Sequence, residues 1–121
     1  MDADMAAYKD DFLQELYECL DIYNQSFVDL ENGDNAAIYE IFRVTHTIKG
    51  MAGFLRYTSL ETLCHSMEEV LSVIKSGDIE IDSELIDIML STVDRITAMV
   101  RKIENEDNDN VKIEDLLEAF D

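Results

Sequence analysis

The sequence predicts an all-α protein, an antiparallel up-down four-helix bundle with a short fifth helix after it. The 121 residues include no proline and only four glycines, so few residues interrupt a helix. Apolar side chains recur three and four positions apart over four long segments, which is the spacing of one helix face. Short connections join these segments, and helices joined in this way pack as antiparallel neighbours.

The first two helices are expected over residues 4–32 and 35–54. Gly33 lies between them, where a helix can end on a left-handed residue, and Asp34 or Asn35 can cap the second helix. The apolar face of the first helix comprises Leu13, Leu16, Leu20, Tyr23, Phe27 and Leu30. The apolar face of the second comprises Ile38, Ile41, Thr45, Ile48, Ala52 and Leu55.

The third helix is expected over residues 59–76, after a tight connection at residues 54–57. Thr58 and Glu61 have the spacing of a capping box, in which each side chain accepts from a backbone N–H of the other's turn. Gly77 follows the helix and can end it. Its apolar face comprises Leu60, Leu63, Cys64, Met67, Leu71 and Ile74.

The last two helices are expected over residues 83–105 and 113–120, separated by a polar loop. Ile81, Asp82 and Ile86 have the pattern of a hydrophobic staple around an N-cap. The apolar face of the fourth helix comprises Leu85, Met89, Thr92, Ile96, Met99 and Ile103. The methionines fall within these faces, which indicates that they fill the core.

The charge of the chain excludes two classes of partner. Nine basic residues face 28 acidic ones, which gives a formal net charge of −19. A surface of this sign repels nucleic-acid phosphates and anionic lipid headgroups, so neither nucleic acid nor a membrane is an expected partner. No apolar run approaches the roughly 18 residues that a membrane span needs, and the acidic N-terminus does not resemble a secretion signal.

The two cysteines do not form a disulfide framework. Cys19 and Cys64 form no C-x-x-C motif, and both fall where a helix would bury them as small core residues. We therefore expect a cytoplasmic protein. Residues 1–121 show no internal repeat or linker, which predicts a single domain.

The second helix carries a polar group outside the predicted core. At about 100° per residue, His46 lies about 140° from the buried direction of Ile41, with Lys49 nearer the flank at about 80°. Gly50 and Gly53 lie on the same outer side and leave the backbone uncovered there. A glycine inside a helix costs about 1 kcal/mol relative to alanine. Close approach of another molecule, or tight contact with a neighbouring helix, would explain both glycines.

The third helix repeats this arrangement with His65 and Glu68. If the connection is centred near Tyr57, an antiparallel hairpin places Glu68 level with His46 and His65 level with Lys49. The two histidines of the chain and two charged residues would then form a small quadrilateral on one side of the hairpin. We expect these four side chains to form the functional site.

This group of side chains suits phosphoryl transfer through an imidazole. A carboxylate that accepts from Nδ1–H of His46 leaves Nε2 free to attack, and Glu68 is the candidate for this role. Lys49 can neutralise phosphoryl oxygens, and His65 can donate a further hydrogen bond. The chain has no glycine-rich nucleotide-binding motif, so a phosphoacceptor is expected rather than a kinase.

The run from His46 to Gly53, HTIKGMAG, resembles the H-x-x-K-G motif of histidine-containing phosphotransfer (HPt) domains. Leu60, Leu63, His65 and Glu68 resemble the L-x-x-L-x-H-x-x-E pattern of one subfamily, the N-terminal phosphoacceptor domain of CheA-type chemotaxis histidine kinases. The resemblance implies a four-helix bundle in which the first histidine is phosphorylated. It also implies a hydrogen-bonded network of that histidine with the lysine, the second histidine and the glutamate.

The same resemblance implies the partners. An ATP-binding kinase domain, elsewhere in a larger kinase that contains this chain as its N-terminal part, would phosphorylate His46. Response-regulator receiver domains would dock near Gly50 and Gly53 and take the phosphoryl group onto an aspartate. This domain itself would bind no cofactor or metal, because ATP would be held by the separate domain.

Three other interpretations stay open at this point. The chain could be a standalone phosphorelay protein of the same family. His46, His65 and Glu68 could instead bind a metal, although the ammonium of Lys49 would repel a cation there. The chain could also be an acidic helical scaffold without chemistry, in which the histidines are ordinary surface residues.

Overall fold

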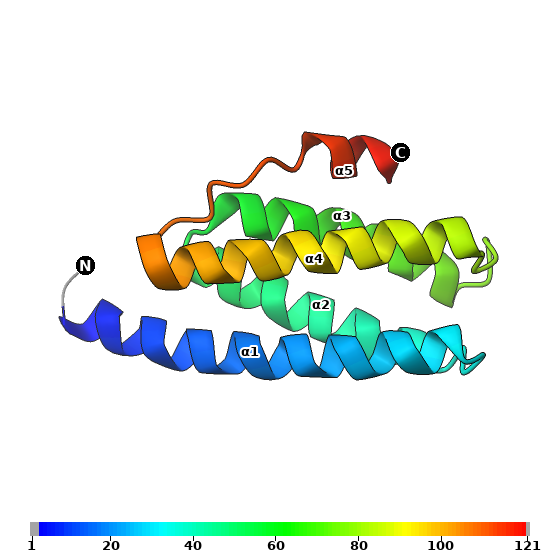
Figure 1. The fold of residues 1–121 in the computed structure, drawn as a ribbon, viewed down its shortest axis with the longest axis horizontal. Coiled ribbons are helices and arrows are strands. Elements are labelled where there is room, and N and C mark those ends of the chain that lie inside the picture. The colour runs from blue at the N-terminus through cyan, green and yellow to red at the C-terminus, as the bar shows by residue number, and fades with distance from the viewer. Residues whose placement is uncertain (1–2, 121) are drawn as a thin grey trace.

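Four long antiparallel helices and one short helix make up the protein, as predicted (Figure 1). The computed structural model describes residues 3–120, and the side chains of residues 7–120. The helices are α1 (Ala3–Glu31), α2 (Ala37–Phe54), α3 (Thr58–Lys75), α4 (Ser83–Glu106) and α5 (Glu114–Ala119). Each of α1 and α3 packs against both α2 and α4, so the four long helices close around one core, while α5 lies outside on α3 and α4.

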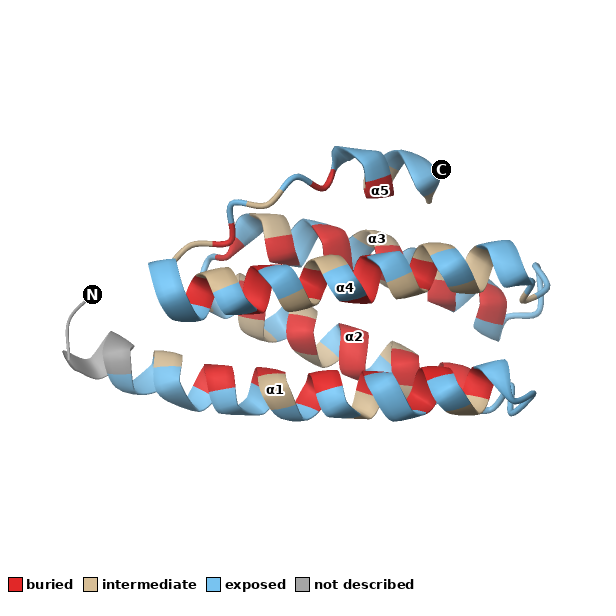
Figure 2. Ribbon diagram, viewed as in Figure 1, coloured by how far each residue is buried: buried red, intermediate tan, exposed pale blue. Residues whose placement is uncertain are grey.

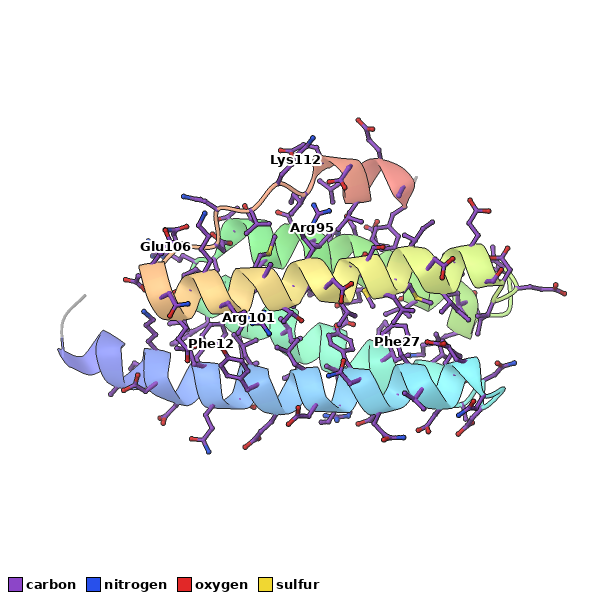
Figure 3. All side chains as sticks on the ribbon, viewed as in Figure 1. Phe12, Phe27, Arg95, Arg101, Glu106 and Lys112 are labelled. Atoms are coloured by element: carbon purple, nitrogen blue, oxygen red, sulfur yellow. The ribbon has the colours of Figure 1, made fainter. Side chains whose placement is uncertain are left out.

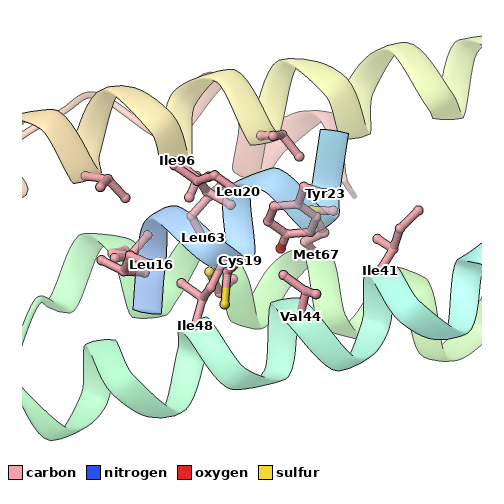
Figure 4. Packing of buried hydrophobic residues seen from close by; sticks show 14 of the residues in the cluster. Leu16, Cys19, Leu20, Tyr23, Ile41, Val44, Ile48, Leu63, Met67 and Ile96 are labelled. Carbon is pink, nitrogen blue, oxygen red and sulfur yellow. The ribbon is translucent and has the colours of Figure 1, made fainter. Parts of the chain in front are cut away.

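The inward faces of the four long helices form a single apolar core. Figure 2 shows the buried residues as stripes along these helices, and Figure 4 shows how side chains from different helices meet. The largest fully buried side chains are Leu16, Tyr23, Ile41, Ile48, Leu60, Leu63, Met67, Leu71, Met89, Ile96, Met99 and Ile103. Cys19 and Cys64 are buried and unpaired, as expected. Leu55 and Leu85, predicted on buried faces, are only half-buried at the edge of the core.

A left-handed residue follows each of the four long helices, and after α4 it is Asp107, with φ of +60°. Gly33 after α1 and Gly77 after α3 have φ of +95° and +83°, where glycine is strongly favoured. After α2 the equivalent residue is Arg56, with φ of +64°, and Tyr57 N–H donates to the carbonyl of Ala52 at 2.9 Å. This short turn reverses the direction of the chain, so α3 packs antiparallel along α2. These two helices carry the predicted site.

Two of the predicted helix caps are wrong. Asp34 accepts a hydrogen bond from Ala36 N–H within the turn, so α2 begins at Ala37, and no side chain caps it. The predicted Thr58–Glu61 capping box does not form at the start of α3 either. The carboxylate of Asp109, in the loop after α4, accepts a hydrogen bond from the first turn of α3 instead.

The predicted cap of the fourth helix is confirmed. Asp82 is the N-cap residue of α4, and its Oδ1 accepts a 2.8 Å hydrogen bond from Leu85 N–H. Its neighbours Ile81 and Ile86 are both partly buried against the core.

The short helix α5 is held on the bundle by its buried Leu116 and by an arginine of α4. Arg95 of α4 donates two hydrogen bonds to Asp115, at 2.9 and 3.0 Å, and one to the backbone carbonyl of Lys112. Figure 3 shows Arg95 on the side of α4 that faces Lys112. None of the helices in residues 3–120 is long and apolar enough to cross a membrane.

Candidate functional site

His46 lies on the outer side of α2, as the helical geometry predicts. Its side chain is 65% exposed, whereas its neighbours Val44, Thr45 and Ile48 are buried. The buried hydroxyl of Thr45 bonds to the Tyr23 hydroxyl of α1 at 2.5 Å and donates to the carbonyl of Ile41. These contacts fix the inner face of α2 and therefore the direction in which His46 points.

Glu68 of α3 connects His46 and Lys49. Its Oε2 lies 3.1 Å from His46 Nδ1, and Lys49 Nζ donates to its Oε1 at 3.0 Å. Glu68 is only 17% exposed and Lys49 only 24%. The tight turn at Arg56 sets the two helices in the register that brings these side chains together, as predicted for His46 and Glu68.

The charge of Glu68 determines which nitrogen of His46 is free. Partial burial alone would raise the pKa of Glu68, but hydrogen bonds from Lys49 and His46 outweigh this effect and lower the pKa below its ordinary value. Glu68 is therefore an ionised carboxylate near neutral pH and only accepts hydrogen bonds. The proton in the contact with His46 must then lie on Nδ1, which leaves a lone pair on Nε2.

His65 differs from its predicted role. Its Nε2 pairs with Glu69 Oε1 at 2.9 Å, one helical turn further along α3, and its side chain is 59% exposed. His65 is level with Lys49, since both line a cavity of about 350 Å³ with Glu61 and Thr62. The structure thus brings three of the four predicted side chains into one hydrogen-bonded group and turns the fourth toward Glu69.

The two glycines on the outer side of α2 have different surroundings. A Cβ on Gly50 would meet nothing within 4 Å, so the backbone there is open to solvent. A Cβ on Gly53 would lie 2.2 Å from the carboxylate oxygen of Glu61. That oxygen is the free end of an exposed, flexible side chain that can move aside, so this contact alone does not require a glycine at position 53, and only Gly50 leaves an open backbone near His46.

An apolar surface that the sequence analysis missed lies beside Gly50. Phe54 is 70% exposed and Tyr8 of α1 is 54% exposed, and their rings meet edge to face at 6.1 Å. With Met51 of α2 and part of α1, these residues line a cavity of about 290 Å³. Exposed aromatic rings next to a reactive side chain are typical of a docking surface.

The other potential nucleophile near the site is inactive. Burial raises the pKa of the Cys64 thiol far above its usual range, and the nearby carboxylate of Glu68 raises it further. Cys64 therefore stays a neutral core residue, because a thiol reacts only as the thiolate. His46 is therefore the exposed candidate for a nucleophile in this region.

Metal binding by His46, His65 and Glu68 is not supported by the geometry. His65 pairs with Glu69 rather than with Glu68, and the carboxylate of Glu68 already forms an ion pair with the ammonium of Lys49. Within the described part of the chain, no three histidine, cysteine or acidic side chains are grouped to hold a metal ion.

Comparisons with known proteins agree on one family. The model of the "Hpt domain" family matches residues 7–120. The chemotaxis protein CheA of Bacillus subtilis is 38% identical over 102 residues, 83% of this chain, and the sensor histidine kinase CheAY of Helicobacter pylori is 34% identical over 120 residues, 96% of the chain. The match spans only 15% of the length of each of these relatives.

Solved structures show the same fold. The CheA phosphotransferase domain from Thermotoga maritima is 39% identical, with a TM-score of 0.77 over 82% of this chain and 96% of that one. A solution structure of the histidine phosphotransfer domain of CheA superposes with a TM-score of 0.86, at 36% identity, over 96% of this chain and 90% of that one. The phosphorylated P1 domain of CheA3 in complex with CheY6 from R. sphaeroides is 26% identical, with a TM-score of 0.80 over 99% of this chain and 94% of that one.

Proposed function

The chain belongs to the Hpt domain family and is similar to the phosphotransferase domain of CheA, and from this premise we propose that His46 carries a phosphoryl group in chemotaxis signalling. The group comes from ATP bound to a separate kinase domain and goes to an aspartate of a response-regulator receiver. The observation that carries the proposal is the contact of Nδ1 of the exposed His46 with the ionised Glu68.

In the first step, the lone pair on His46 Nε2 attacks the γ-phosphorus of ATP. An N–P bond forms, the bond from the γ-phosphorus to the bridging oxygen breaks, and the electron pair leaves with ADP. The proton on Nδ1 stays in its hydrogen bond with Glu68, which stabilises the positive charge that the ring acquires. Lys49, held by Glu68 one helical turn from His46, offers a positive charge to the phosphoryl oxygens.

In the second step, a carboxylate oxygen of the receiver aspartate attacks the phosphorus. The N–P bond breaks and its electron pair returns to Nε2, so His46 regains its starting form and can accept another phosphoryl group. We assign His65 no role in either step, because its Nε2 contacts Glu69 and not the group of His46, Lys49 and Glu68.

The receiver docks on the apolar surface formed by Tyr8, Gly50, Met51 and Phe54. This surface adjoins the outer side of α2, and the bare backbone at Gly50 lets a partner approach His46 closely. The complex of the related P1 domain of CheA3 with CheY6 supports a receiver as the partner. Gly53, predicted as part of this surface, is covered by the side chain of Glu61, which would have to move aside for a receiver to contact this glycine.

The parent protein is a histidine kinase in which this chain is one domain. The proposal rests on the length of the relatives, of which the chain matches 15%. The domain needs no cofactor of its own, because the kinase domain holds ATP. The reaction takes place in the cytoplasm, where ATP is available and where the buried cysteines stay reduced.

Labelling with radioactive phosphate tests this function. The chain is incubated with the kinase core of a CheA protein and [γ-32P]ATP, and in parallel with phosphoramidate, which needs no partner. We expect one acid-labile, base-stable phosphoryl group per chain, absent in His46→Gln and present in His65→Gln. Addition of a CheY receiver should then remove the label from the chain. Label that persists in His46→Gln would reject the assignment of His46, and the same test excludes a scaffold without chemistry.

A further inference from the structure

We infer that Phe42 is a positioning residue for His46, and that Lys75 of α3 holds Phe42 in place for this purpose. The inference rests on the proposed function, since it explains how the imidazole ring is aimed for transfer. It concerns residues outside the hydrogen-bonded group of His46, Lys49 and Glu68.

The hydrogen bond to Glu68 alone does not fix the ring of His46. This bond holds Nδ1 in place, but the ring can still pivot about the line from Nδ1 to the carboxylate oxygen. The side chain is 65% exposed, so little packing opposes that motion. A second contact is needed to give Nε2 one direction, because attack on phosphorus requires aligned atoms.

Phe42 supplies this second contact. It lies four residues before His46 on α2, so both side chains lie on the same side of the helix, one turn apart. The planes of the two rings differ by only 6°, and their centroids are 6.4 Å apart. This is an offset parallel stack, one of the preferred arrangements of aromatic rings. A ring held at Nδ1 and stacked beside Phe42 can no longer pivot freely.

Phe42 is itself held on two sides. Its ring is half-buried and packs against the core. The ammonium of Lys75 lies 3.8 Å from the ring centroid, well within the range of a cation–π contact, and 5.6 Å from the ring of Tyr39. Lys75 is the last residue of α3, and it restricts the rotation of Phe42 from outside.

The helix α3 thus determines the orientation of His46 through two of its residues. Glu68 and Lys75 are seven residues apart, which places them two turns apart on one face of α3. Glu68 binds the imidazole directly, and Lys75 acts through Phe42. With Nδ1 bonded and the ring stacked, Nε2 is the nitrogen directed toward a partner.

Phosphorylation by phosphoramidate, followed at His46, tests the inference without a docking partner. Phe42→Leu keeps an apolar side chain of similar size but removes the flat ring, and we expect it to slow the reaction about threefold to tenfold. Phe42→Tyr should restore the wild-type rate. Tyr39→Leu is the matched control, because Tyr39 is an aromatic residue of α2 near Lys75 that does not stack on His46, and its rate should equal the wild type.

A double-mutant cycle separates the two roles. Lys75→Met should slow the reaction by a smaller factor than Phe42→Leu, and Lys75→Arg should restore it. In the Phe42→Leu background, Lys75→Met should have no further effect, because Lys75 acts through the ring. An additional slowing of the double variant would show that Lys75 acts on the phosphoryl group itself and would overturn its assignment.

Nuclear magnetic resonance reads the ring directly and independently of phosphoryl transfer. We expect nuclear Overhauser contacts between the rings of Phe42 and His46, and a single Nδ1–H tautomer of His46 in the wild type and Phe42→Tyr. Phe42→Leu should keep the tautomer that Glu68 determines, but its His46 ring should sample several orientations, seen as averaged three-bond couplings of that side chain, in a chain that unfolds at a similar temperature. If the wild type is labelled at His46 while Phe42→Leu keeps the wild-type rate and a single ring orientation, this inference fails and the proposed function stands. If the wild type is not labelled at His46, the proposed function fails.

Discussion

The backbone N–H of Leu60, in the first turn of α3, donates a 2.9 Å hydrogen bond to Oδ2 of Asp109, which lies 49 residues further along the chain. Asp109 is buried at 8% exposure, and its carboxylate satisfies an N–H group that the helix cannot satisfy itself. The negative charge of Asp109 also interacts favourably with the positive, N-terminal end of the helix dipole. The loop between α4 and α5 thus holds the start of the helix that carries Glu68.

Removal of this cap should destabilise the whole bundle. Asp109→Ala leaves a buried N–H without an acceptor and should lower the free energy of unfolding by about 1–2 kcal/mol. Asp109→Asn keeps an oxygen acceptor and should cost less. Urea unfolding measures both. Glu106→Ala, at an exposed residue of the same region, is the control and should change stability little; equal effects of Asp109→Ala and Glu106→Ala would contradict the cap.

Glu68→Gln should slow phosphorylation of His46 while the bundle stays folded. The neutral amide stabilises the charged imidazole less than the carboxylate, and we expect a loss of roughly tenfold in rate or more. Glu69→Gln makes the same change one residue along α3, where the carboxylate pairs with His65 instead. It should leave the rate unchanged, and a rate as slow as that of Glu68→Gln would contradict the specific role of Glu68.

The wild type and Glu68→Gln should differ in stability, and the size of the difference should depend on pH. The pKa of Glu68 is lower in the folded chain than its ordinary value of 4.5, so its contribution is fully present above about pH 4.5 and lost as the pH falls through the folded pKa. The difference in free energy of unfolding between the wild type and Glu68→Gln should therefore shrink below about pH 4.5. Chemical denaturation from pH 3 to pH 7 measures it, and a difference that grows toward acid would contradict the pKa.

Lys49→Met should affect both the acidity of Glu68 and the transfer reaction. The hydrogen bond from Lys49 helps to lower the pKa of Glu68, so its loss should raise that pKa toward the ordinary value. It also removes the positive charge one helical turn from His46 and should slow phosphorylation by roughly tenfold. Lys49→Arg should recover part of both effects. Carbon-13 NMR titration of the Glu68 carboxyl measures its pKa. If Lys49 has a merely structural role, this pKa should not change in Lys49→Met.

The attachment of α5 should weaken in acid. Hydrogen bonds from Arg95 lower the pKa of Asp115 to about 2 from an ordinary value of 3.8. The contact is therefore fully formed above about pH 3.8 and lost as the pH falls toward 2. The protection factors of the Leu116 and Leu117 amides in α5, which remove the intrinsic pH dependence of exchange, should fall over this range, and in Asp115→Asn they should be lower than in the wild type above this range. Protection factors that stay constant as the wild type is acidified would argue against this ion pair.

Helical geometry explains why so much of the site could be predicted. The angular positions of His46 and Glu68 follow from the helix period, and their register follows from one short turn at Arg56. Helical geometry gives the direction of a side chain, but it does not choose between partners on the same face. His65 illustrates this limit, because Glu69 lies within its reach and takes its Nε2.

The features that the sequence analysis missed depend on contacts between distant parts of the chain. The Thr58–Glu61 box does not form because α3 begins one residue earlier than predicted, so that Glu61 N–H donates to the carbonyl of Tyr57. Asp109, from the loop after α4, accepts from Leu60 N–H instead. The surface formed by Tyr8 and Phe54 depends on how α1 and α2 pack. No local pattern of residues encodes either contact.

The position of the phosphoryl group on the imidazole ring tests the account most directly. Nuclear magnetic resonance of the phosphorylated chain, with proton–phosphorus couplings to the ring protons, distinguishes the two nitrogens of His46. The hydrogen bond between Nδ1 and Glu68 predicts a phosphoryl group on Nε2 of His46 alone. A phosphoryl group on Nδ1, or on His65, would contradict it.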